Sequence, residues 1–127
     1  MSDTVLDASA VLAVLNNEPG RERVVPILYE SFISAVNLAE VVTKMTEAGA
    51  PESELREKLA SLFLLIVPFN EGLAYRTGLL RSQTRRYGLS LGDRACLALA
   101  AQLNLPAYTS ERVWARIDIG VNIVVIR

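Results

Sequence analysis

Four acidic side chains stand where they could do chemistry together. Asp7 and Glu111 each follow a short apolar run that predicts a β-strand. Glu40 lies within one predicted helix, and Asp93 lies at the start of another. Acids at strand ends and helix starts converge in a parallel sheet, because ligands collect beyond the carboxyl ends of its strands. A pocket of carboxylate oxygens suits hard cations such as Mg²⁺ or Mn²⁺, whereas zinc prefers nitrogen and sulfur.

The chain contains no histidine. A Ser-His-Asp triad, a Cys-His nucleophile pair and a pair of histidines sharing acid and base duty are therefore excluded. If the protein is an enzyme, its chemistry must come from carboxylates, hydroxyls, Arg, Lys or a metal bound through oxygen.

Two of the acids also have a capping interpretation. Asp7 is placed to cap a helix that begins at Ala8, by accepting a backbone N–H with a side-chain oxygen. Ser90 and Asp93 have the spacing of a capping box at the start of an apolar helix. Capping and a functional role are compatible at both positions, so neither acid decides the question alone.

The other two acids have equally simple structural interpretations. Glu40 shares a polar helix face with Lys44, four residues on, and this pair explains Glu40 as a solvated side chain. An acid in the first turn of a helix, as predicted for Glu111, is favoured by the helix dipole. The functional hypothesis therefore depends on the joint pattern of the four acids.

Elements of two kinds must position these acids. Short β-type runs alternate with longer helical patterns, which is typical of an α/β layer fold with a parallel sheet. Pro26 is expected to bend or shorten the second helix, and Gly49 and Gly88 to end later ones. The predicted strands cover residues 4–6, 32–34, 65–67, 107–109 and 122–126, with 65–67 as a central strand. The predicted helices cover residues 8–15, 21–30, 36–48, 52–63, 71–87, 91–103 and 111–115.

Length and composition predict one domain over residues 1–127, with 51% hydrophobic residues to form its core. Cys96 is the only cysteine, which excludes an internal disulfide and fits the reducing cytoplasm.

The chain has no Lys or Arg before Arg21, so it lacks the basic start of a secretory signal. No apolar run approaches the roughly 20 residues that a transmembrane helix needs.

The formal net charge of -1 means that any nucleic-acid-binding surface must be local. Basic residues gather on and just after the predicted helix over residues 71–87, and some of them are candidates for contacts with phosphate groups. A solvated helix face, or a surface that contacts a partner, explains them equally well. The candidates are Arg76, Arg81, Arg85, Arg86 and Arg94.

Four segments together resemble a known family, the PIN domain ribonucleases, and among them the VapC-like toxins of toxin-antitoxin pairs. The segments are VLDASA at residues 5–10, NLAEV at 37–41, LSLGDRACLALA at 89–100, and TSE at 109–111 followed by Trp114. Each segment is weakly specific alone. In this order and in a chain of this length, they span nearly the whole sequence and are specific together.

The resemblance implies a PIN-like three-layer fold, with a twisted parallel sheet between helices, and a metal-dependent endoribonuclease activity. It carries the metal-binding and catalytic roles over to Asp7, Glu40, Asp93 and Glu111, with Mg²⁺ or Mn²⁺ as the cofactor. Water would attack the RNA phosphodiester in line, one ion activating the water and another stabilising the leaving oxygen. Ser9 matches a position that often lines such sites, as does Thr109. A cognate antitoxin and a toxin homodimer are the implied partners.

One departure from the family pattern concerns Glu111, because the family usually has Asp at this position. The extra methylene moves the carboxylate by roughly a C–C bond length, about 1.5 Å, and weakens a second metal site or makes it act through water. A catalytically inert PIN-fold interaction module is therefore one alternative. A receiver-like signalling domain is another, but Val67 leads into Pro68 instead of an acceptor Asp, and both lysines lie within predicted helices.

Overall fold

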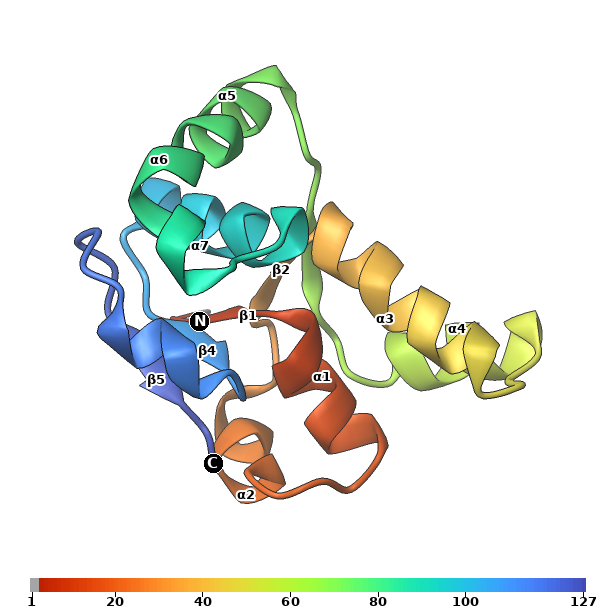
Figure 1. Ribbon diagram of the computed structural model, residues 1–127. Coiled ribbons are helices and arrows are strands. Elements are labelled where there is room, and N and C mark those ends of the chain that lie inside the picture. The colour runs from red at the N-terminus through yellow and green to blue at the C-terminus, as the bar shows by residue number, and fades with distance from the viewer. Residues whose placement is uncertain (1–2) are drawn as a thin grey trace.

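A parallel sheet organises the molecule. The computed structural model describes residues 3–127, and Figure 1 follows its elements along the chain. Within these residues the strands are β1 (Val5–Leu6), β2 (Phe32–Ser34), β3 (Leu65–Val67), β4 (Ala107–Thr109) and β5 (Ile123–Val125). The helices are α1 (Ala8–Leu15), α2 (Arg21–Val24), η1 (Val25–Ile27), α3 (Ala35–Glu47), α4 (Glu52–Ala60), α5 (Glu71–Leu79), α6 (Arg81–Thr84), η2 (Arg85–Tyr87), α7 (Leu91–Leu103) and η3 (Arg112–Arg116).

The strands lie in the order β3-β2-β1-β4-β5, and every neighbouring pair is parallel. β1 is therefore central, and Asp7 follows it directly. A receiver domain has the strand order 2-1-3-4-5, so this arrangement excludes the receiver-like alternative.

The prediction of a central strand over residues 65–67 is wrong, because β3 lies at the edge of the sheet, where Leu65 and Ile66 are 40% and 45% exposed. A short apolar run indicates a strand but carries no information about its neighbours.

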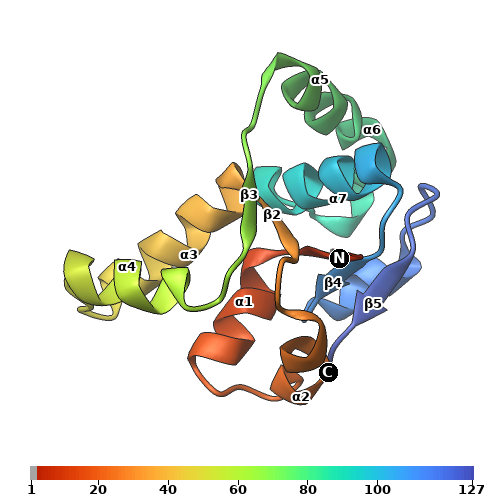
Figure 2. The ribbon, with the colours of Figure 1, turned by 180° about the vertical axis from the view of Figure 1, so that it is seen from behind.

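Two hydrophobic cores lie on opposite faces of the sheet. Val5 and Leu6 are consecutive and fully buried, yet they belong to different cores, because successive side chains of a strand point to opposite faces. Val5 packs with residues of α5, α7 and η3. Leu6 packs with residues of α1, α3 and α4. Figure 2, seen from behind, shows α5, α6 and α7 on one side of the sheet and α1 and α2 on the other. The predicted α/β fold with helices on both faces is confirmed.

Helix α7 carries the clearest local signals. The Ser90 hydroxyl accepts the Asp93 N–H, and the Asp93 carboxylate accepts the Ser90 N–H, so the predicted capping box is present. The following run of small and aliphatic residues over 95–100 is buried against the sheet. Asn104 ends the helix with a left-handed φ of 55°. No helix within residues 3–127 is long and apolar enough to cross a membrane.

Two predicted helices are interrupted, and a third, predicted over residues 52–63, ends early as α4 at Ala60. The second predicted helix ends as α2 at Val24 and tightens into the 3₁₀ turn η1, which contains Pro26, as the proline predicts. The single helix predicted over residues 71–87 is instead divided into α5, α6 and η2. Gly78 lowers helix propensity just before the division, and the Thr84 hydroxyl donates to the Leu80 carbonyl, a bond that bends helices.

Gly20 stands where the backbone and the space around it both require glycine. Its φ is +97°, and an added Cβ would lie 2.7 Å from Ile126 Cγ1 and 2.8 Å from the Ile126 carbonyl oxygen. We expect Gly20→Ala to lower the free energy of unfolding by about 2–4 kcal/mol, because left-handed strain of about 1–2 kcal/mol adds to a clash with backbone. Urea unfolding measures the loss.

Gly49→Ala is the matched control for Gly20→Ala. Gly49 has a similar φ of +92°, but an added Cβ there would meet no atom within 4 Å. This control should show the conformational strain alone and therefore a smaller loss. Equal losses in the two variants would mean that the contact with Ile126 contributes nothing.

Candidate active site

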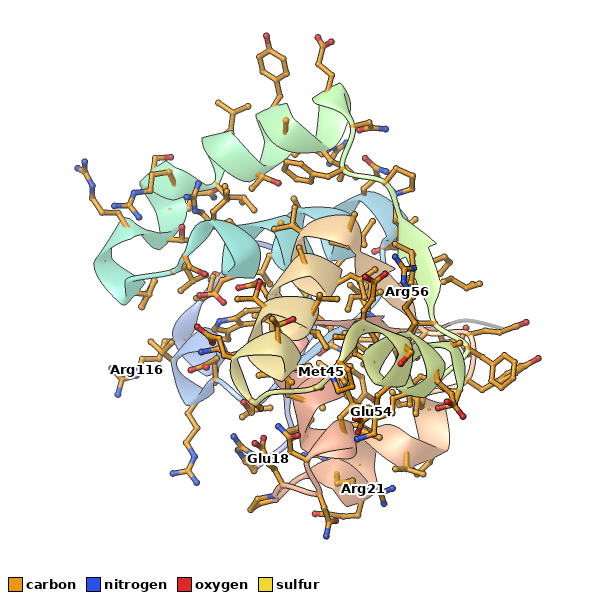
Figure 3. All side chains as sticks on the ribbon, turned by 90° about the vertical axis from the view of Figure 1, so that its right-hand side faces the viewer. Glu18, Arg21, Met45, Glu54, Arg56 and Arg116 are labelled. Carbon is orange, nitrogen blue, oxygen red and sulfur yellow. The ribbon has the colours of Figure 1, made fainter. Side chains whose placement is uncertain are left out.

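The four predicted acids line one pocket of about 300 Å³, which we call the acidic pocket. Its walls come from the first half of α1, from α3 between Asn37 and Lys44, from the first turn of α7, and from the segment after β4. Figure 1 shows the N-terminal ends of α3 and α7 meeting beside α1. Figure 3 labels Glu18, which lines the same pocket from the loop after α1. The acids in the pocket are Asp7, Glu18, Glu40, Asp93 and Glu111.

Asp7 is the most deeply buried of these acids, with 3% of its surface exposed. One carboxylate oxygen, Oδ1, accepts the Ala10 N–H at 2.8 Å and the Ser9 hydroxyl at 2.7 Å. The other, Oδ2, accepts the Thr109 hydroxyl at 2.6 Å. Asp7 therefore caps α1, as its structural interpretation predicts, and it also faces the acidic pocket.

Burial raises the pKa of the Asp7 carboxyl from 3.8 to about 6. The hydrogen bonds from Thr109, Ser9 and Ala10 oppose this rise, because they favour the charged form, and the negative charge of Asp93 adds to it. A buried carboxylate beside another carboxylate is unfavourable in the absence of a cation. The position therefore costs stability that capping alone does not require.

Two hydroxyl groups tie Asp7 to the neighbouring strand. Thr109 is fully buried at the end of β4, donates to Asp7 and accepts the Glu111 N–H at 3.0 Å. Ser9 donates to Asp7 and accepts the Ser110 N–H at 2.9 Å. Both residues that the family resemblance places beside the site thus contact its central acid.

We expect Thr109→Val to loosen Asp7. Valine has the same shape but cannot donate to the carboxylate, and the Glu111 N–H loses its acceptor as well. The free energy of unfolding should fall by about 1–3 kcal/mol, the cost of leaving buried polar groups without partners. Thermal or urea unfolding of the metal-free protein measures this loss of stability.

Thr43→Val is the control, because the exposed Thr43 hydroxyl only donates to the Ala39 carbonyl. A loss no larger than in this control would contradict the role of the hydroxyl.

Asp93 combines its capping bond with a place in the acidic pocket. The bond to the Ser90 N–H, at 2.9 Å, uses Oδ2. The side chain is half-buried, and its charge reaches Asp7 strongly enough to raise the pKa of that carboxyl. Capping and a place in the acidic pocket coexist here, as the sequence allows.

Glu40 differs from its solvated interpretation. The ion pair of Lys44 is with Glu47, at 4.0 Å, and not with Glu40. Glu40 is half-buried and accepts a hydrogen bond from the side-chain amide of Asn37 at 2.8 Å. Its carboxylate lies against Gly92, in the first turn of α7. The tertiary contact with α7, and not the neighbouring lysine, determines where Glu40 points.

Glu111 is the outermost of the four predicted acids. Its side chain is exposed, and its backbone N–H is held by Thr109. The position follows β4 as predicted, on the same sheet edge as Asp7, and lines the acidic pocket.

The thiol of Cys96 gives a second indication that three acids converge. Cys96 is fully buried in the core one turn after Asp93. Burial raises the pKa of its thiol, and the negative charges of Asp7, Asp93 and Glu40 raise that pKa further. Three carboxylates from separate parts of the chain therefore lie near enough for their charges to act on the same thiol.

The oxygen atoms that line the acidic pocket are the kind of ligand that a hard divalent cation prefers, although the acidic side chains among the described residues are not arranged to enclose one. Within residues 3–127, no group of three or more Asp, Glu or Cys side chains is close enough together to hold a metal ion. The groups facing the acidic pocket are nevertheless oxygen donors, which Mg²⁺ and Mn²⁺ prefer. Asn37, which also lines the acidic pocket, has a buried Oδ1 without a hydrogen-bond partner. A cation would offset both the burial of the Asp7 charge and its repulsion by Asp93, which raise the pKa of Asp7.

The predicted phosphate-binding arginines lie elsewhere. None of the five lines the acidic pocket. Arg94 donates to the Thr77 carbonyl at 3.1 Å, and its Nε is buried without a partner, so it links α7 to α5. Arg81 donates to the Leu89 carbonyl at 3.5 Å. Arg94 is half-buried and its guanidinium donates to α5, away from the acidic pocket, so its contact with phosphate stays a prediction.

The sequence did not indicate a site role for five polar residues that line the acidic pocket, which are Glu18, Asn37, Lys44, Ser110 and Arg127. The basic residues there are Lys44 and Arg127, and the buried amide is that of Asn37. Helical spacing places Asn37 and Lys44 on the face of Glu40, which was the available signal. No sequence signal pointed to Arg127, because it reaches the acidic pocket through a bond to Glu18, at 3.3 Å, that joins distant parts of the chain.

Solved structures share this fold over nearly its whole length. The first is DNA-bound VapBC from Salmonella typhimurium, with a TM-score of 0.75 and 24% identity over 98% of both chains. A toxin-antitoxin complex from Klebsiella pneumoniae has a TM-score of 0.74 and 21% identity, again over 98% of both chains. VapC20 from Mycobacterium tuberculosis, described as a Sarcin-Ricin loop cleaving toxin, has a TM-score of 0.73 and 15% identity over 94% of this chain and 98% of that one. No curated protein sequence matches the chain.

The family assignment rests on sequence as well as on fold. The PIN domain family matches residues 4–120, which include all four predicted acids and every strand but β5. The chain belongs to the PIN domain family.

Proposed function

We propose that this protein is a metal-dependent endoribonuclease that hydrolyses RNA phosphodiester bonds, and that it is the toxin of a toxin-antitoxin pair. The observation that carries the proposal is the meeting of Asp7, Glu40 and Asp93 in one oxygen-lined pocket. Membership of the PIN domain family supports the nuclease class. The likeness to VapC20, a Sarcin-Ricin loop cleaving toxin, supports RNA as the substrate.

Asp7, Glu40 and Asp93 are the proposed cation ligands, with Glu111 as an outer ligand. A bound Mg²⁺ or Mn²⁺ supplies Lewis acidity, which makes water more acidic and offsets charge on the phosphate. Three hydrogen bonds fix the orientation of the Asp7 carboxylate. We propose that Glu40 also orients the attacking water and accepts its proton.

Basic residues at the acidic pocket have a separate role in this proposal. Lys44 and Arg127 are exposed and line it, so they are placed to contact RNA phosphates next to the cleaved bond. Their positive charge also reduces the repulsion between RNA and the carboxylates.

The decisive experiment incubates the purified protein with total cellular RNA and Mg²⁺, with and without EDTA. We expect cleavage with Mg²⁺ and none with EDTA, and mapping of the fragment ends identifies the bond that is cut. Cleavage that persists in EDTA would refute the metal mechanism.

A catalytically inert PIN-fold module is the second candidate. It is favoured by the exposed Glu111 and by the absence, within residues 3–127, of acids close enough to enclose an ion. Failure to cut any RNA with Mg²⁺ or Mn²⁺ would favour this candidate over the nuclease.

The proposed partners are a cognate antitoxin and a second copy of the chain, acting in the cytoplasm. Similar chains occur in VapBC and other toxin-antitoxin complexes, which supports the antitoxin. Trp114 is fully buried and unavailable for such contacts, whereas Tyr29 is 65% exposed and packs against Phe63 with ring centres 5.6 Å apart. Light scattering of the purified chain, alone and with the antitoxin, tests both partners.

A further inference from the structure

The side-chain amide of Asn37 links two of the elements that form the acidic pocket. Asn37 lies in the first turn of α3 and is 1% exposed. Its Nδ2 donates to Glu40 Oε1 at 2.8 Å and to the Gly92 carbonyl at 3.0 Å. Gly92 immediately precedes Asp93 in α7. One amide group therefore connects the Glu40 carboxylate to the helix that carries Asp93.

Gly92 provides the space that the Glu40 carboxylate occupies. An added Cβ at Gly92 would lie 2.3 Å from Glu40 Oε1 and 2.5 Å from Glu40 Cδ. The backbone of Gly92 is helical, a conformation that any residue adopts, so the carboxylate and not the backbone requires glycine here. A side chain at this position would push the carboxylate away from α7.

The orientation of the amide follows from its two partners. Glu40 Oε1 and the Gly92 carbonyl are both acceptors, so the amide nitrogen must face them, and the reversed orientation would place an oxygen against two oxygens. This orientation leaves Asn37 Oδ1 buried without a partner, which is unfavourable. An alanine would avoid that cost, so packing alone does not account for asparagine.

We propose that Asn37 is a positioning residue for the metal site. Its amide and the bare Cα of Gly92 together hold the Glu40 carboxylate in the acidic pocket beside Asp93. The proposal rests on the proposed function, because it concerns the same cation site. Outer groups that orient metal ligands typically change metal affinity by about 10–100-fold when they are removed.

The test measures Mn²⁺ binding by calorimetry without RNA, in the unmodified protein and in Asn37→Ala and Gly92→Ala. Both variants should bind Mn²⁺ about tenfold more weakly. Gly92→Ala displaces the far end of a flexible side chain and should fold normally, so it remains informative if Asn37→Ala unfolds. Gly78→Ala is the matched control, because Gly78 is also helical and an added Cβ there meets no atom within 4 Å.

A second measurement asks whether the effect passes through Glu40. In a Glu40→Gln background, Gly92→Ala and Asn37→Ala should weaken Mn²⁺ binding no further, because the carboxylate that they position is gone. Equal additional losses in that background would indicate a general structural role and overturn the inference.

The outcomes separate the two proposals. If the unmodified protein binds Mn²⁺ and cuts RNA while Asn37→Ala and Gly92→Ala bind as it does, the positioning role is wrong and the proposed function stands. If the unmodified protein binds no Mn²⁺ and cuts no RNA, the proposed function fails and the positioning role fails with it.

Discussion

Asp7→Asn is expected to reduce the rate of RNA cleavage by about 1000-fold, the order of loss seen when one member of a catalytic set is removed. Asp7 follows the central strand, and three hydrogen bonds hold it facing the acidic pocket. Asparagine keeps the size of the side chain and an oxygen that can still cap α1. It removes the negative charge that a divalent cation requires.

Initial rates at saturating Mg²⁺ measure this loss. Asp118→Asn is the control, because it makes the same chemical change on an exposed side chain outside the acidic pocket, and its rate should match that of the unmodified protein. Circular dichroism establishes that both variants are folded. An Asp7→Asn variant that cuts RNA at the normal rate would show that no essential cation is bound there.

The same substitution is expected to stabilise the metal-free protein at neutral pH. Burial raises the pKa of Asp7 from 3.8 to about 6, so the folded state binds this proton more tightly than the unfolded state does. The resulting stability is fully present below about pH 3.8 and is lost as the pH rises through about 6. At 1.36 kcal/mol per unit, the loss amounts to about 3 kcal/mol by pH 7.

Urea unfolding in EDTA, at a series of pH values, measures this effect. The free energy of unfolding of Asp7→Asn should equal that of the unmodified protein near pH 4 and exceed it by about 2–3 kcal/mol at pH 7. Added Mg²⁺ should stabilise the unmodified protein and not the variant, because only the former keeps the charge that binds it. A difference that does not change with pH would contradict the buried charge.

Elements with strong local signals were predictable. The capping box of Ser90 and Asp93 and the buried run after it predict α7, and Pro26 correctly shortens α2. The strand over residues 65–67 was predicted with the correct bounds, but its predicted central position was wrong, because apolar residues look the same at the edge as at the centre of a sheet. The division between α5 and α6 lies between Gly78 and the hydroxyl bond from Thr84 to the Leu80 carbonyl, and a helical pattern does not reveal such a bond.

For the site, the sequence indicated which acids line the acidic pocket but not what holds them. Glu40 was interpretable as solvated because Lys44 lies at the right helical spacing, and its actual partners depend on the approach of α7. Arg94 appeared available because it follows an arginine-rich helix, but packing of α7 on α5 turns it inward.

By itself the sequence determined the residue types, the oxygen-only chemistry that a chain without histidine permits, and the alternation of strands and helices. These properties depend on side-chain chemistry and on interactions between residues a few positions apart. Only the tertiary structure decided that Asp7 meets Thr109, 102 positions away, and that Gly92 leaves room for Glu40. Such contacts form when the sheet and its covering helices pack, so their geometry depends on the whole fold and not on local spacing.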